Sequence, residues 1–159
     1  MTAYTDTLTS PIGPLTVVVN GDGALTHVLF AHQPPPAGAQ ANAGRCADAV
    51  AQLHEYFAGE RTAFDLPLAP AGSEFQRTVW TQLQGLAYGQ VTDYGSLGAS
   101  IGRPYSARAV GRANATNPIP IVIPCHRVIG ANGSLTGYAG GMEAKRVLLD
   151  LESRAAAAA

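Results

Sequence analysis

The chain has 159 residues, of which 47% are apolar and 13% are charged, so it can bury a core in one domain or two small ones. No apolar stretch approaches the length of a membrane span, and residues 1–10 lack the basic start and apolar centre of a signal peptide. We therefore expect a cytoplasmic protein with no membrane partner. Two cysteines, Cys46 and Cys125, are too few for a disulfide framework or a zinc cluster, so we expect no metal site.

The net charge of -1 hides an asymmetry along the sequence. Residues 1–72 hold two arginines against six acidic residues, whereas residues 73–127 hold five arginines against two acidic residues. A nearly neutral chain is a poor candidate for nucleic-acid binding, because counterion release rewards a basic surface. The basic middle segment weakens that objection, although a surface helix can show such a run by chance.

The first 72 residues predict a small antiparallel sheet. Residues 4–8, 15–19 and 24–30 favour strands, and Asn20-Gly21-Asp22-Gly23 between the last two is a strong hairpin signal. The Pro-, Ala- and Gly-rich residues 32–44 predict a loop. Helical spacing of apolar residues then predicts a helix over 45–57, and a further strand is expected over 64–68 before a linker.

The remaining residues predict a mainly helical domain. Ser73-Glu74-Phe75-Gln76 has the pattern of a capping box, and the helix after it places Trp80 in the core. Thr92 or Asp93 can cap a short helix that ends near residue 101, and after Gly102-Arg103-Pro104 a second helix covers about 105–115. Two short helices joined by a tight glycine-containing break have the shape of a helix-turn-helix.

These patterns together predict an α+β protein. We expect a small sheet-containing domain over residues 1–72 and a helical domain with the helix-turn-helix over residues 73–159.

The second helix of the pair has mostly small side chains. Readers of the major groove need long polar side chains for base edges, whereas small residues let a backbone approach closely. Small residues plus one arginine suit the minor groove of DNA; the alternative is ordinary Ala/Gly helix packing with that arginine in solvent. The candidate DNA contacts on this helix are Ser106, Ala107, Arg108, Ala109, Gly111 and Arg112.

A thiol and an imidazole stand side by side at the end of a stiff apolar segment, residues 117–128. Its three prolines fix φ and remove backbone donors, so the segment is either an edge strand or an extended loop. Apolar burial raises the pKa of a thiol and makes it inert, whereas an adjacent base makes thiolate available. Cys125 beside His126 thus indicates an activated nucleophile, with a small buried hydrophobic side chain as the alternative.

In the last predicted helix, about residues 142–152, Glu152 falls on the apolar face one turn after Leu148. A carboxylate at a helix C-terminus also faces the unfavourable end of the helix dipole. These two features favour a functional Glu152; the alternative is a frayed end, at which it pairs with Arg154 in solvent. The alanines at 155–159 are expected to be dispensable.

The Pro-Cys-His-Arg-Val motif, the Pro-spaced run before it and the helix pair resemble the O6-alkylguanine-DNA alkyltransferases, also called methylated-DNA-protein-cysteine methyltransferases. These proteins repair alkylated guanine by moving the alkyl group onto their own cysteine. The resemblance runs from about residue 73 to 152, and it makes the first domain ribonuclease-H-like. It implies a monomer without a cofactor that acts once on double-stranded DNA carrying O6-alkylguanine, with O4-alkylthymine as a further candidate substrate.

The resemblance also implies roles for single residues in DNA binding. Tyr94 promotes extrusion of the damaged nucleotide, and Arg108 fills the gap in the base stack. The extrusion is required because the O6 atom cannot meet a thiolate in line inside the duplex, and it costs roughly a few kcal/mol.

The same resemblance implies a catalytic relay and a pocket. Glu152 holds His126, which acts through a water on Cys125, while Asn117 steadies the arrangement. The implied substrate pocket consists of Tyr94, Asn114, Val128, Tyr138 and Ala139. Ala139 stands where some members carry Ser, so its backbone amide can donate to O6 but a hydroxyl contribution is missing.

Two other functions compete with alkyl transfer. A non-catalytic protein that senses alkyl lesions in DNA would need the helix pair but not Cys125. A cysteine hydrolase could use Cys125, His126 and Glu152. In such enzymes, however, the catalytic Cys and His usually come from distant segments and are not adjacent, and a hydrolase would need no helix with Arg108.

Overall fold

The computed structural model describes residues 2–158 of the chain, with side chains as far as residue 155. The chain divides into two compact units, Met1–Ala71 and Gly72–Ala159. Within the described residues, none of the helices has both the length and the apolar character needed to span a membrane.

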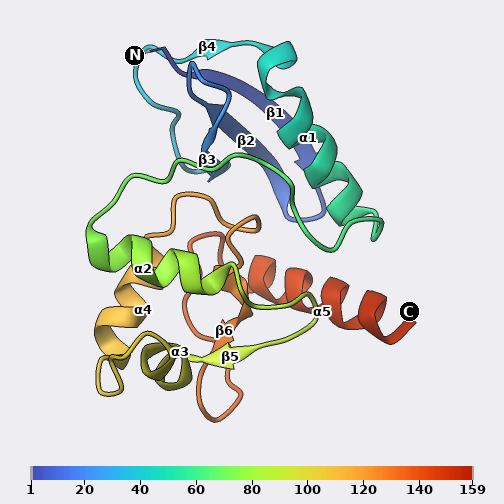
Figure 1. Cartoon of the computed structure of the whole chain (residues 1–159). Helices are drawn as coiled ribbons and strands as arrows, with labels where there is room; N and C mark the ends of the chain where they lie inside the picture. Colours follow the sequence, from blue (N-terminus) through green and yellow to red (C-terminus); the bar gives the residue numbers. More distant parts are fainter. Residues whose placement is uncertain (1, 159) are drawn as a thin grey trace. The chain divides into compact units, whose positions relative to one another are not determined.

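The first unit is a four-stranded sheet with one helix on it (Figure 1). Strands β1 (Tyr4–Ser10), β2 (Gly13–Val19) and β3 (Leu25–Phe30) pair antiparallel, and the two-residue β4 (Gln40–Ala41) adds to β1 in parallel. Helix α1 (Ala43–Phe57) covers one face of the sheet. The prediction of an antiparallel sheet with one helix is confirmed.

Local side-chain chemistry explains where these elements begin and end. The Asn20 side chain accepts the amides of Asp22 and Ala24, both at 3.0 Å, which closes the predicted hairpin. Helix α1 begins two residues before its predicted start, because the side-chain Oδ1 of Asn42 accepts the Arg45 amide at 3.1 Å and caps the helix.

The strand predicted over residues 64–68 is wrong. That segment makes a single isolated bridge, between Leu68 and Leu25. Leu25 donates to the Pro67 carbonyl and accepts from the Ala69 amide, at 2.8 and 2.9 Å. Pro67 and Pro70 cannot donate, so the pairing does not extend.

The second unit contains four helices and a two-stranded parallel sheet. The helices are α2 (Glu74–Leu83), α3 (Tyr94–Ser100), α4 (Ala107–Ala115) and α5 (Met142–Ala158), and the strands are β5 (Thr92–Asp93) and β6 (Val128–Ile129). The capping box at Ser73 is present, and Asp93 rather than Thr92 caps α3. Helix α4 starts two residues later than predicted, with Ser106 as its N-cap. Helix α5 runs on into the alanine tail, of which Ala159 lies outside the described residues.

Helices α3 and α4 form the predicted helix-turn-helix, and α2 supports them (Figure 1). The buried indole of Trp80 donates to the Ala113 carbonyl at 2.8 Å, which joins α2 to the end of α4. The turn between α3 and α4 passes close to Gly98, where a Cβ atom would lie 2.8 Å from the Arg103 carbonyl oxygen. Gly98 is therefore needed for the close approach of the turn.

We predict that Gly98→Ala destabilises the protein although alanine is the better helix former. The clash with backbone costs about 1–3 kcal/mol and exceeds the gain in helix propensity. Gly111→Ala is the matched control, since its Cβ would meet the Tyr94 ring at an ordinary 3.6 Å. Urea unfolding followed by circular dichroism should show a lower midpoint for the first variant and an equal or higher midpoint for the second. Equal midpoints for both variants would contradict the packing described here.

Candidate active site

The segment before the cysteine is a buried loop, which decides between the two predicted alternatives. It makes only an isolated bridge, between Pro120 and Ile123, in the described structure. The Asn117 side chain accepts the Ile119 amide at 2.9 Å and donates to the Ile123 carbonyl at 2.8 Å. Both ends of the loop are thus held by one amide group.

The loop contains a strained residue. Ile121 has φ of 75°, a region that a β-branched side chain rarely adopts and that costs on the order of 1–3 kcal/mol. Its side chain is 1% exposed, so burial in the core helps to maintain that conformation. The stiffness expected from the prolines is therefore reinforced by packing and by Asn117.

Cys125 opens a single 3₁₀ turn, η1 (Cys125–Arg127), and is 5% exposed. Burial raises the pKa of its thiol to about 11, and this rise is opposed by a hydrogen bond from Asn117 and by the charge of Lys145. The resting side chain is therefore a thiol. A group that accepts its proton is needed before the sulfur can act as a nucleophile.

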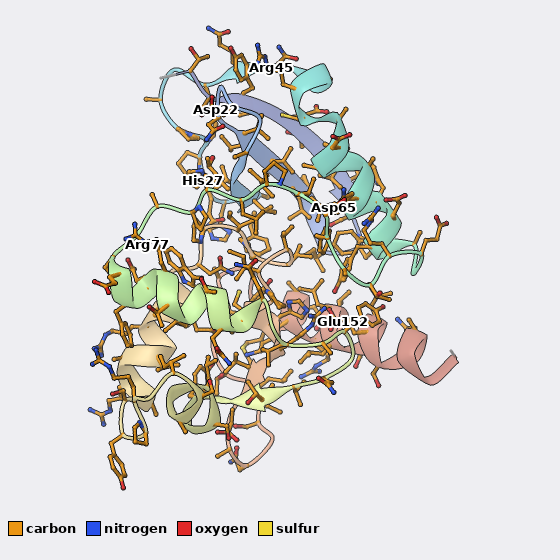
Figure 2. The ribbon with its side chains drawn as sticks, viewed as in Figure 1. Asp22, His27, Arg45, Asp65, Arg77 and Glu152 are labelled. Atoms are coloured by element: carbon orange, nitrogen blue, oxygen red, sulfur yellow. The ribbon has the colours of Figure 1, made fainter. Side chains whose placement is uncertain are left out.

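Glu152 is the centre of a buried network at the next two residues. Glu152 lies on α5, is labelled in Figure 2, and is 1% exposed as a residue. His126 Nε2 lies 2.6 Å from Glu152 Oε2. Arg127 binds the same carboxylate in bidentate fashion, with Nε at 2.7 Å from Oε1 and Nη2 at 3.0 Å from Oε2. The alternative pairing of Glu152 with Arg154 is wrong, because Arg154 donates to the Asp150 carbonyl.

This network fixes the proton arrangement of His126. An ionised carboxylate only accepts, so Nε2 carries the hydrogen, and Nδ1 of the neutral ring is a lone-pair acceptor. Burial lowers the pKa of His126, and the charges of Arg127 and Lys145 lower it further against the opposing effect of Glu152. Nδ1 is buried and has no hydrogen-bond partner among residues 2–158. His126 is therefore neutral near neutral pH, with a nitrogen free to accept a proton.

Two buried cations were missed by sequence reasoning. The sequence identifies Arg127 only as one of the basic residues of the middle segment. In the structure it binds Glu152 and also donates to the Leu86 carbonyl at 2.8 Å. Lys145 is fully buried and donates to the Val128 and Thr136 carbonyls at 2.6 and 3.2 Å. A signal for Lys145 existed, because it lies three and seven residues before Leu148 and Glu152 and so shares their helix face.

The predicted pocket residues have different environments. Asn114 is buried and its Nδ2 lies 3.3 Å from the Cys125 carbonyl, while its Oδ1 has no partner within the described residues. Val128 is buried on β6, where it pairs with Thr92. Tyr94 and Tyr138 are half-buried, and Ala139 is exposed. The Tyr94 hydroxyl is hydrogen-bonded to that of Thr136.

The predicted DNA contacts lie on one helix with a clear inner and outer side. Val110, Ala113 and Asn114 form the buried side of α4. Arg108 and Arg112 are exposed one turn apart, so both guanidinium groups project from the outer side. The remaining candidates are exposed at Ala107 and half-buried at Ser106, Ala109 and Gly111.

Among the described residues, no three His, Cys, Asp or Glu side chains are grouped so that they could hold a metal ion. The site brings together a buried thiol, a neutral imidazole and a carboxylate paired with a buried arginine.

Comparison with known proteins connects this site to one family. The DNA-binding domain of 6-O-methylguanine DNA methyltransferase matches residues 74–154, and the ribonuclease-like domain of the same proteins matches residues 3–70. A methylated-DNA-protein-cysteine methyltransferase of Mycolicibacterium paratuberculosis is 52% identical over 93% of this chain and 91% of its own length. One of Methanosarcina acetivorans is 47% identical over 90% of this chain and 94% of its own length.

Solved structures agree with the sequence matches. The crystal structure of Mycobacterium tuberculosis OGT in complex with DNA superposes with a TM-score of 0.90 at 45% identity, and covers 98% of this chain and 94% of that one. The chain therefore belongs to the 6-O-methylguanine DNA methyltransferase family.

Proposed function

We propose that this protein repairs DNA by moving the alkyl group of O6-alkylguanine onto Cys125, as a methylated-DNA-protein-cysteine S-methyltransferase. One observation carries the proposal. A buried thiol is followed directly by a neutral imidazole whose far nitrogen is fixed by an ionised carboxylate. Relatives with the corresponding name and a relative crystallised with DNA support the substrate class.

The reaction balances without a cofactor. The Cys125 thiol gives its proton to Nδ1 of His126, through a water as in the family it resembles. The thiolate attacks the alkyl carbon, the bond from that carbon to O6 breaks, and a thioether forms. The guanine stays in the DNA and gains one proton at its ring, which matches the proton that the thiol lost. Because the thioether is chemically inert, each molecule acts once.

We assign the binding of DNA to the helix-turn-helix. The exposed side of α4 lies in the minor groove, with Arg108 in the place of the extruded nucleotide and Tyr94 promoting the extrusion. Ser106, Ala107, Ala109, Gly111 and Arg112 are the further contacts on this helix. Their small size and the outward direction of both arginines support this assignment.

The extruded base is received by a pocket next to the thiol. We assign its walls to Asn114, Val128, Tyr138 and Tyr94, and the donor to O6 to the backbone amide of Ala139. The contact of Asn114 with the Cys125 carbonyl supports its place in this pocket. Asn117 holds the loop that presents the thiol.

We assign alkyl transfer and DNA binding to residues 73–159 and a ribonuclease-like domain to residues 1–72. Cys125, His126, Glu152 and Arg108 all belong to one compact unit, which supports our proposal of a monomer. We propose a cytoplasmic location for it from the sequence alone. A lesion sensor is not favoured, because it would have no use for the thiol and its relay.

The first prediction identifies the acceptor by mass. Incubation with duplex DNA that carries O6-methylguanine should add one methyl group to the intact chain and stop after one equivalent. Peptide mapping should place the methyl group on Cys125. Cys125→Ser should abolish the mass increase and keep DNA binding.

Three results would contradict this assignment. Methylation of Cys46 would move the nucleophile to the other unit, and binding without any mass change would indicate a lesion sensor. Turnover of many equivalents by an unmodified protein would indicate a hydrolase.

The second prediction separates gap filling from chemistry. Arg108→Ala should slow transfer from duplex DNA at least tenfold more than transfer from the free modified base, because only the duplex leaves a gap to fill. Arg77→Ala, which removes the same charge from the exposed side of α2, is the matched control. Single-turnover rates on both substrates provide the measurement. Equal losses on the duplex and on the free base would show that Arg108 is structural.

A further inference from the structure

The loop between β6 and α5, residues 130–141, is held to other elements of the unit at Thr136. Its tip is closed by its own hydrogen bonds, among them Gly130 to the Ser134 carbonyl at 2.8 Å and Ser134 Oγ to Asn132 Oδ1 at 2.7 Å. Thr136, in contrast, binds two other elements. Its hydroxyl is hydrogen-bonded to that of Tyr94, the first residue of α3, and its carbonyl accepts from Lys145 of α5 at 3.2 Å.

Lys145 favours one donor in the hydrogen bond between the hydroxyls of Thr136 and Tyr94. A buried ammonium group has three hydrogens and only donates. Its nitrogen lies near three oxygens, the Val128 carbonyl at 2.6 Å, the Thr136 carbonyl at 3.2 Å and Thr136 Oγ1 at 3.5 Å. The Thr136 oxygen can therefore accept from Lys145 and still donate its own hydrogen to Tyr94. The hydroxyl group thus bridges the ammonium group in the core to the phenol on α3.

We propose that Thr136 is a positioning residue that fixes Tyr94 relative to the loop of residues 130–141. This inference rests on the proposed function, in which Tyr94 promotes extrusion and Tyr138 and Ala139, two and three residues after Thr136, receive the base. The bridge joins the first helix of the DNA-binding pair to the segment that closes the pocket. An extruded base can then meet Tyr94 and Tyr138, on two sides of the proposed pocket, in one fixed arrangement.

The half-buried Tyr94 ring supports this role. A Cβ atom on Gly111 would lie 3.6 Å from that ring, so Tyr94 packs along α4, and its far end is held by Thr136. Arg108 lies on the same helix as Gly111. Thr136 therefore acts at the junction of the DNA-binding helices and the pocket, while Asn117 holds the loop before the thiol and Glu152 holds His126.

The test uses Thr136→Val, which keeps the shape and removes the hydroxyl, and Thr136→Ser, which keeps the hydroxyl. At saturating duplex DNA, Thr136→Val should slow transfer about tenfold, as expected for the loss of one or two hydrogen bonds in a pre-organised site. Thr136→Ser should restore the rate to within about threefold, and the affinity for DNA should stay unchanged in both variants. Ser134→Ala, which loses a hydroxyl within the same loop, is the matched control and should react at the normal rate.

A double-mutant cycle with Tyr94→Phe identifies the partner. If Thr136 acts through the Tyr94 hydroxyl, Thr136→Val should have little further effect in the Tyr94→Phe protein. Additive losses, a normal rate for Thr136→Val, or failure of Thr136→Ser to restore the rate would overturn the inference. If the protein without substitutions still becomes alkylated, these outcomes would leave the proposed function intact. If the protein without substitutions is not alkylated, both the proposed function and this inference would fail.

Discussion

The second unit, residues 72–159, depends on the pairing of one buried carboxylate, that of Glu152. An ionised group in the interior is costly unless it is fully paired, and removal of one partner of such a pair costs about 3–5 kcal/mol. Glu152 accepts from His126, from two nitrogens of Arg127 and, at 3.4 Å, from the Gly89 amide. Helix α5, the turn with the nucleophile and the chain after α2 are therefore joined at one point, and this junction helps to position Cys125.

Burial keeps the Cys125 sulfur in its thiol form in the resting protein, against the effect of a nearby positive charge. Arg127 pairs with the Glu152 carboxylate, and both burial and the charge of that arginine lower the pKa of His126, so its ring is neutral and can accept a proton. Lys145 supplies a buried positive charge that favours the thiolate, yet burial still dominates and raises the pKa of Cys125 to about 11. A protein that we propose to act only once gains from this, because a permanently ionised Cys125 would be lost to oxidants and other electrophiles.

The features that sequence could predict are those encoded by near neighbours. The Asn20 hairpin, the Ser73 capping box, the paired helices and the position of Glu152 on an apolar face all follow from spacing and local hydrogen bonding. The roles of Arg127 and Thr136 could not be predicted, because their partners lie 9 to 42 residues away and leave no periodic pattern. The helix face of Lys145 follows from its spacing to Leu148 and Glu152, but its partner Val128 lies 17 residues away. The erroneous strand over residues 64–68 has the same cause, since its pairing depended on a distant strand and on two prolines.

The proposed reaction requires His126 to be a neutral base with its hydrogen on Nε2 and its lone pair on Nδ1. NMR of the imidazole nitrogens in histidine-labelled protein tests this directly, with the signals of His126 among the four histidines identified by their loss in His126→Gln. At neutral pH we expect a protonated Nε2 and an unprotonated Nδ1. Since the pKa of His126 lies below its ordinary 6.5, protonation should occur only in more acidic solution. The folded protein should then lose stability as the pH falls below 6.5, because the unfolded chain binds that proton first. An imidazolium at neutral pH, or a hydrogen on Nδ1, would contradict the account.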